Sequence, residues 1–143
     1  MPKQHPIERR FKRLATANNK KADRLGRSGR ISHVTLYNVY EESGGFCAYC
    51  GVGITASGCS FDHVVPFDRG GENNADNLVA CCTVCQRAKF TKTPEEFEQY
   101  QQLRVTCPTC GRSFRPRWAD YVRGLGRYCS RACSGAVGGA TKS

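Results

Sequence analysis

The sequence predicts a small α+β chain whose two modules are each held together by a metal ion. Segments with the apolar period of an α-helix alternate with two short segments rich in β-forming residues. Ten cysteines occur among 143 residues, and eight of them form four close pairs. A chain of this length fits one domain, or a small domain with an appendage.

The first predicted element is a basic helix over residues 6–25. Ile7, Phe11 and Leu14 recur at helical steps, and cationic side chains cover the rest of the surface. Because the apolar stripe is narrow, we expect this helix to dock loosely or to become ordered only on a polyanion. The sequence GRSG at 26–29 predicts a linker after it.

The middle of the chain predicts two short strands. A second helix is expected at about 34–42, with Ser32 as a candidate N-cap. Residues 60–65 alternate and are rich in β-formers, so they predict a strand. The composition of residues 67–76 predicts a loop, and residues 77–81 predict a second short strand or extended segment.

Two further helices are expected after the strands. One begins between residues 82 and 92. For the next, Thr93 supplies an N-cap, Pro94 the first helical position and Glu96 the acid at position N3. This capping box predicts a helix that runs to about residue 103.

Charge is distributed unevenly along the chain, which has 22 Lys and Arg against 12 Asp and Glu and a formal net charge of +10. Residues 1–33 carry a net +8, residues 34–103 a net −5 and residues 104–143 a net +7. Basic ends around an acidic centre are expected when the ends bind phosphates and the centre holds carboxylates for another purpose. Basic tails that are merely solvated have the same composition.

Nothing in the sequence marks the chain for a membrane or for export. No apolar run approaches the roughly 18 residues that span a bilayer. The opening residues MPKQHPIERRFKRL place charges where a secretory signal needs an apolar stretch. We therefore expect an intracellular protein with no membrane partner. In a reducing compartment metal explains the cysteines better than disulfides do, although a secreted, disulfide-stapled domain is the alternative.

The cysteine pairs predict two structural zinc sites. The first site comprises Cys47, Cys50, Cys82 and Cys85, and the second comprises Cys107, Cys110, Cys129 and Cys133. Four thiolates leave no open position on zinc, so both sites are structural. The second module has about forty residues, too few to fold without its metal. Cys59 and Cys81 remain as free thiols in core or strand positions.

Residues 61–89, FDHVVPFDRGGENNADNLVACCTVCQRAK, combine an Asp-His pair, a Gly-Gly loop, Asn-Leu, Cys-x-x-Cys and a following Lys. Over residues 36–92 this combination resembles the HNH nuclease family, of the phage or mobile-element type. The resemblance implies a ββα-metal core around one catalytic divalent ion, stapled by the first zinc site. The C-terminal module is similar to zinc-ribbon or treble-clef knuckles that accompany some phage nucleases.

The resemblance implies three domains: a basic N-terminal helical arm at 1–33, an HNH nuclease domain at 34–104 and an arginine-rich zinc module at 105–143. It implies an endonuclease that nicks DNA or cuts both strands, in the cytoplasm or in a host cytoplasm if phage-encoded. The alternative is an inactive zinc-dependent DNA-binding protein on the same fold. RNA binding or cleavage is a weaker alternative, because no stacking platform of aromatic residues is visible.

Hydrolysis of a phosphodiester needs a base to deprotonate water and a Lewis acid to stabilise the phosphate and the leaving oxygen. His63 suits the base because its ordinary pKa is near neutral. The resemblance implies that Asp62 is a catalytic metal ligand and that Asn77 orients the His63 ring. Gln86 stands where the family usually has His or Asn, which implies a second ligand whose amide oxygen suits Mg²⁺ or Mn²⁺.

Cationic side chains expected to contact double-stranded DNA occur in the N-terminal helix, the nuclease core and the C-terminal module. They are Arg9, Arg10, Lys12, Arg13, Lys20, Lys21, Arg69, Arg87, Lys89, Arg112, Arg115, Arg117, Arg123, Arg127 and Arg131. Guanidinium groups favour phosphate oxygens and groove edges. A zinc-stapled protein-interaction module is the alternative for the C-terminal region. One site cuts one strand, so a double-strand break predicts a homodimer or two successive events.

Overall fold

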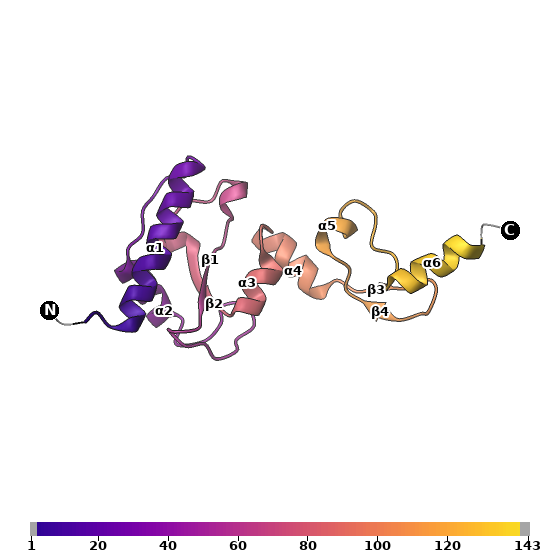
Figure 1. Cartoon of the computed structure of the whole chain (residues 1–143), viewed down its shortest axis with the longest axis horizontal. Helices are drawn as coiled ribbons and strands as arrows, with labels where there is room; N and C mark the ends of the chain where they lie inside the picture. The colour runs from indigo at the N-terminus through magenta and orange to yellow at the C-terminus, as the bar shows by residue number, and fades with distance from the viewer. Residues whose placement is uncertain (1–2, 141–143) are drawn as a thin grey trace. The chain divides into compact units, whose positions relative to one another are not determined.

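The computed structural model describes residues 3–140 and divides the chain into two compact units, residues 1–97 and 98–143 (Figure 1). Residues 1–2 and 141–143, at the outer ends of the expected terminal domains, lie outside the described residues. The three-domain division at 33/34 and 104/105 stays a prediction. Within residues 3–140, no helix is both long enough and apolar enough to cross a membrane.

The first unit is small α+β, as the sequence predicts. Its helices are α1 (Pro6–Arg24), α2 (His33–Glu42), α3 (Thr83–Lys89) and the start of α4 (Pro94–Gln102). Its strands are β1 (Ser60–His63) and β2 (Leu78–Cys81), and two short 3-10 turns, Phe67–Arg69 and Ala75–Asn77, lie in the segment between them. β1 ends two residues earlier than the sequence pattern suggests.

The two strands form an antiparallel pair that positions the site. Phe61 pairs with Ala80, and His63, the last residue of β1, pairs with Leu78, the first of β2. α3 contacts β1 and α2 contacts β2. Figure 1 shows α3 directly after β2, so the order strand, strand, helix is the expected ββα arrangement.

The expectation of a loosely docked N-terminal helix is wrong, because α1 contributes to the core. Phe11 is 1% exposed, and its ring meets the ring of Phe61 edge to face at 5.2 Å. Leu36 of α2 is buried in the same cluster. The stripe on α1 is narrow, yet side chains from β1 and α2 pack against it, with Phe11 fully buried and Ile7 and Leu14 partly buried.

The segment after α1 is held in place rather than free. The side-chain amide of Asn19 accepts from the N–H of Ile31 and donates to its carbonyl, both at 2.9 Å. Gly29 has φ +97, and a Cβ there would stand 2.3 Å from the carbonyl oxygen of Asn73. A side chain at Gly29 would therefore push this segment off the loop that contains Asn73.

Helix α4 begins at the predicted capping box. The Thr93 hydroxyl accepts from the Glu96 N–H at 3.2 Å, and the Glu96 carboxylate accepts from the Thr93 N–H at 3.1 Å. Phe97 on its first turn packs edge to face on Tyr49, with ring centroids 5.1 Å apart. The start of α4 is thereby fixed to the first cysteine pair.

The second unit contains the end of α4, β3 (Val105–Thr106), β4 (Ser113–Phe114), α5 (Trp118–Tyr121) and α6 (Arg131–Ala140). β3 and β4 pair antiparallel. Trp118 meets Tyr100 edge to face at 6.2 Å. Its likeness to a zinc ribbon or treble clef stays a prediction.

Candidate active site and metal centres

A hollow of about 290 Å³ lies where β1 ends beside α1 and α3. Asp62 and His63 line it from β1, Gln86 and Arg87 from α3, and Lys21 from α1. The structure therefore brings the expected base and both expected ligands to one place. Asp62 and His63 can share this hollow, although they are neighbours in a strand, because the strand ends at His63.

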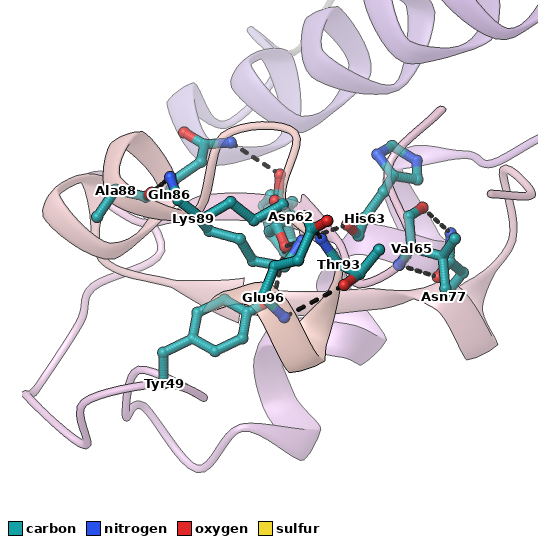
Figure 2. Close-up of polar contacts among 12 residues, drawn as sticks. Tyr49, Asp62, His63, Val65, Asn77, Gln86, Ala88, Lys89, Thr93 and Glu96 are labelled. Atoms are coloured by element: carbon teal, nitrogen blue, oxygen red, sulfur yellow. Dashed lines mark hydrogen bonds and ion pairs between the residues drawn. The ribbon is translucent and has the colours of Figure 1, made fainter. Parts of the chain in front are cut away.

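Asp62 is 7% exposed and is held by two donors on the same oxygen. Its Oδ2 accepts from the Tyr49 hydroxyl at 2.6 Å and lies 2.9 Å from Lys89 Nζ. Among the described residues, Oδ1 has no hydrogen-bond partner. Figure 2 shows Tyr49 and Lys89 converging on the carboxylate. Burial and the bond to Asp62 raise the pKa of Tyr49, so its hydroxyl stays a donor.

The expectation that Lys89 contacts DNA is wrong. Its side chain is fully buried, and besides Asp62 its ammonium donates to the His63 carbonyl at 3.0 Å. A buried ammonium is stable because it is paired with a carboxylate, and that pairing keeps it away from a phosphate at the surface.

The sequence analysis did not identify Tyr49 as a site residue. Its position between Cys47 and Cys50 was the one feature of the sequence that could have indicated it.

The His63 ring is fixed from two sides. Its centroid lies 4.1 Å from the Phe67 ring, and Nε2 lies 3.0 Å from Asn73 Oδ1. Burial lowers the pKa of His63, and the bond to Asn73 and the charge of Asp62 only partly offset this. The ring is therefore neutral at neutral pH, the form in which it can take a proton.

A chain of amides fixes which ring nitrogen is free. Because Ile31 N–H is a donor, the atom of Asn19 that meets it is Oδ1, and that same Oδ1 accepts from Asn73 Nδ2 at 2.8 Å. The oxygen of Asn73 then faces His63, so Nε2 must carry the hydrogen. Nδ1 is left with its lone pair.

The expectation that Asn77 orients the His63 ring is wrong, and Asn73, 0% exposed, takes that role. The Asn77 amide is engaged elsewhere: Oδ1 accepts from Val65 N–H at 2.8 Å, and Nδ2 donates to the carbonyls of Val65 and Glu72 at 3.0 and 2.8 Å. Asn77 ties the segment after β1 to the start of β2. Spacing in the sequence could not show which asparagine contacts His63, because this depends on the path of the loop between β1 and β2.

The side chain of Gln86 lines the hollow, but its amide nitrogen, and not the expected amide oxygen, is directed toward β1. Its Nε2 donates to the Phe61 carbonyl at 3.0 Å, and Figure 2 shows the amide oxygen on the far side of that bond. To offer its oxygen to a cation beside Asp62, the amide must turn over and give up this bond. Its role as a ligand stays a prediction.

The eight paired cysteines form the two clusters that the sequence predicts. In each cluster the four sulfurs lie within 4.8 Å of one another. Sulfurs at 2.3 Å from a tetrahedral zinc are about 3.8 Å apart. The Cys50–Cys82 separation is 3.8 Å, and the Cys110–Cys129 separation is 3.5 Å. The donor set and its spacing thus fit a zinc ion in each cluster.

The surroundings of the first cluster shift the pKa values of two of its thiols in opposite directions. Burial raises the pKa of Cys47, but backbone N–H groups around the sulfur outweigh this and lower it to about 6. Burial and the neighbouring sulfurs raise the pKa of Cys85. A divalent ion bound between the sulfurs would favour their thiolate forms.

The expected DNA-contacting cations differ in their availability. Arg10 is unavailable, because its guanidinium donates to the carbonyls of Ala56 and Cys59. Lys12, Arg69 and Arg115 are partly engaged, with Glu8, Glu96 and the Gln101 carbonyl respectively. The remaining side chains are exposed: Arg9, Arg13, Lys20, Lys21, Arg87, Arg112, Arg117, Arg123, Arg127 and Arg131.

Known proteins share the segment that carries this site. Residues 47–101 match the family model of the HNH endonucleases. A CRISPR-associated endonuclease Cas9 of Corynebacterium diphtheriae is 35% identical over 86 residues, which are 58% of this chain and 8% of that protein. The Cas9 of Actinomyces naeslundii is 40% identical over 72 residues, 48% of this chain and 6% of that protein.

The crystal structure of the Type II-C Cas9 enzyme from Actinomyces naeslundii is similar at 32% identity, over 66% of this chain and 10% of that chain, with a TM-score of 0.45. The chain spans less than a tenth of the length of the curated relatives that it matches. The matched segment contains both strands, α3 and the Asp62-His63 pair. Over residues 47–101, which contain this site, the chain therefore carries an HNH endonuclease segment.

Proposed function

We propose that this chain hydrolyses phosphodiester bonds of DNA with one divalent cation and His63 as the general base. One observation carries the proposal: a single hollow contains an aspartate with an unpartnered oxygen and a neutral histidine with an unprotonated nitrogen. Both side chains are held by buried partners, so neither has to be ordered when substrate binds.

The donors around the hollow fit a hard cation. Asp62 Oδ1 is a carboxylate oxygen, and Gln86 can add its amide oxygen once the amide turns over. Oxygen donors of this kind favour Mg²⁺ or Mn²⁺ over softer metals. Such a cation, when bound, stabilises negative charge on the phosphate and on the leaving oxygen.

The side chains of the chain itself supply the remaining steps. His63 Nδ1 accepts a proton from the attacking water, while Asn73 holds the ring in the tautomer that allows this. Lys21 and Arg87 are exposed cations at the edge of the hollow, and they bind phosphates that flank the scissile bond. The exposed arginines of residues 105–131 add a further phosphate-binding surface.

Zinc in the two cysteine clusters has a structural role in this proposal. The first cluster joins the loop that contains Tyr49 to the start of α3, and both segments contact Asp62 or line the hollow. No observation supports a homodimer, so the proposal concerns one chain and one strand at a time.

An inactive DNA-binding protein is the second candidate, and the orientation of Gln86 favours it. In the observed geometry the amide presents its donor end toward β1, so a cation has one protein ligand rather than two. Fewer ligands weaken cation binding without affecting the basic surface.

Cleavage of supercoiled plasmid in Mg²⁺ or Mn²⁺, with His63→Ala as the control, tests the proposal. We expect nicked plasmid from the parent protein and none from the variant. Absence of nicked or linear product with either metal, while the protein still retards DNA in a gel, would favour the inactive candidate. A competition with duplex RNA tests whether DNA is the substrate.

A further inference from the structure

Phe90 has a backbone conformation that an aromatic residue rarely adopts. Its φ is +46° with ψ −118°, and within residues 3–140 it is the one non-glycine residue with a positive φ. For a bulky side chain this region is an outlier, and such outliers gather at functional sites. Phe90 ends α3, where its N–H donates to the Gln86 carbonyl at 2.9 Å. A glycine would end the helix in the same way with less strain.

The ring of Phe90 adds nothing to the core. Its side chain is 73% exposed, and the ring forms none of the aromatic pairs found among the described residues. Phe90 lowers the stability of the folded chain in two ways: its backbone conformation is strained, and its apolar ring is exposed to water. A ligand that covers the ring would offset the cost of its hydration.

Phe90 lines the hollow that contains Asp62 and His63. Lys21 and Arg87 line the same hollow, so the ring stands among cations next to the candidate base. Cations flanking an exposed aromatic ring are the pattern of a surface that binds a nucleic-acid strand: the cations take phosphates and the ring takes a base. If a phosphate binds at His63, the bases on either side of it lie close to the Phe90 ring.

We propose that Phe90 is a nucleobase contact, whose ring stacks on the base beside the scissile phosphate and separates it from its neighbour. The inference rests on the proposed DNA substrate. Apolar side chains that enter a base step unstack it, and base–aromatic stacking does not depend strongly on sequence. Phe90 thereby selects DNA whose stacking is easily opened at the cut.

Fluorescence of 2-aminopurine in bound DNA tests the contact. The probe is one duplex oligonucleotide sequence prepared as a set, each member carrying a single 2-aminopurine at a different position. The protein carries His63→Ala, so that the DNA stays intact. We expect the fluorescence to rise at one position, because the base loses its stacked neighbour, and the rise to disappear when Phe90→Gly is added.

Three variants separate the ring from the fold. Phe90→Gly removes the ring and suits the positive φ, so the urea midpoint and the zinc content stay equal to those of the parent or rise. Its DNA affinity falls on the order of 10- to 100-fold, while Phe90→Trp keeps the parent affinity. Val84→Ala is the matched control, because Val84 is also 73% exposed on α3 but does not line the hollow.

Two results overturn the inference. One is a Phe90→Gly protein that binds DNA as the parent does or keeps the fluorescence rise. The other is a lower urea midpoint for Phe90→Gly, which assigns the ring to the fold. The proposed function fails separately: if the fluorescence rise depends on Phe90 but no plasmid is nicked, the base contact stands and the cleavage proposal does not.

Discussion

The Nε2 atom of His63 lies 3.0 Å from Oδ1 of Asn73, and this bond decides which nitrogen of the candidate base can take a proton. Asn73 is in turn oriented by Asn19 on α1, whose amide is fixed by the backbone of Ile31. The N-terminal helix therefore helps to build the candidate active site, in addition to its expected role of binding DNA.

Substitution Asn73→Ala is expected to lower kcat about 10- to 100-fold, the range for residues that orient a catalytic group. The neutral His63 ring would no longer be held in the Nε2–H form. Nitrogen-15 chemical shifts of the ring, measured on the metal-free protein, report this change directly. Asn38→Ala, at an exposed position on α2, is the control and leaves kcat and the shifts unchanged.

Substitution Asn77→Ala separates orientation of the base from support of the loop. It removes three hydrogen bonds to the backbone of Val65 and Glu72, so we expect the free energy of unfolding to fall by about 1–3 kcal/mol in urea. The His63 ring shifts stay those of the parent. A tautomer change in Asn77→Ala with none in Asn73→Ala would show that our assignment of the two roles is reversed.

Tyr49→Phe is expected to weaken Mn²⁺ binding about tenfold, a modest loss for a group that orients a metal ligand. The hydroxyl donates to Asp62 Oδ2 at 2.6 Å, and without it the carboxylate is held by Lys89 alone. Electron paramagnetic resonance of free Mn²⁺ measures the affinity. Tyr37→Phe, on the exposed face of α2, is the matched control. Equal affinity in the two variants would show that Tyr49 does not orient Asp62.

Zinc content is expected to be about two ions per chain, one in each cysteine cluster. Cys47→Ser or Cys107→Ser should each lower it to about one, because a tetrahedral site that loses a thiolate binds zinc weakly. Cys59→Ser serves as the control, since Cys59 is buried outside both clusters. Metal analysis after gel filtration gives the count, and a Cys59→Ser protein that loses an ion contradicts the assignment.

Arg87→Gln and Arg10→Gln are expected to differ, although the sequence predicts both arginines as DNA contacts. The first removes an exposed cation, so the slope of log affinity against log salt should fall by about 0.9. The second leaves two backbone carbonyls without donors, so it lowers the free energy of unfolding by about 1–3 kcal/mol and leaves the slope unchanged. DNA titrations at several salt concentrations and urea unfolding distinguish them; identical behaviour would contradict this division.

Local patterns in the sequence were sufficient for the helices and strands up to α4, whereas β3, β4 and α6 were not predicted. The capping box at Thr93 and Glu96 placed the start of α4, and β-forming residues placed both strands to within two residues. Cysteine spacing identified both clusters, since two or three residues between paired thiols is a spacing typical of zinc ligands. These signals are short-range, so they are visible without tertiary contacts.

By itself the sequence determined the small α+β class, the two thiol clusters and the Asp62-His63 pair at a strand end. Only the tertiary structure decided which asparagine orients His63, that Lys89 is buried against Asp62, and that Tyr49 holds the same carboxylate. Each of these contacts joins residues that lie at least ten positions apart in the sequence. For His63, the sequence also offers two nearby asparagines, Asn73 and Asn77, of the same residue type. Their choice depends on loop paths and burial, which no periodicity or spacing encodes.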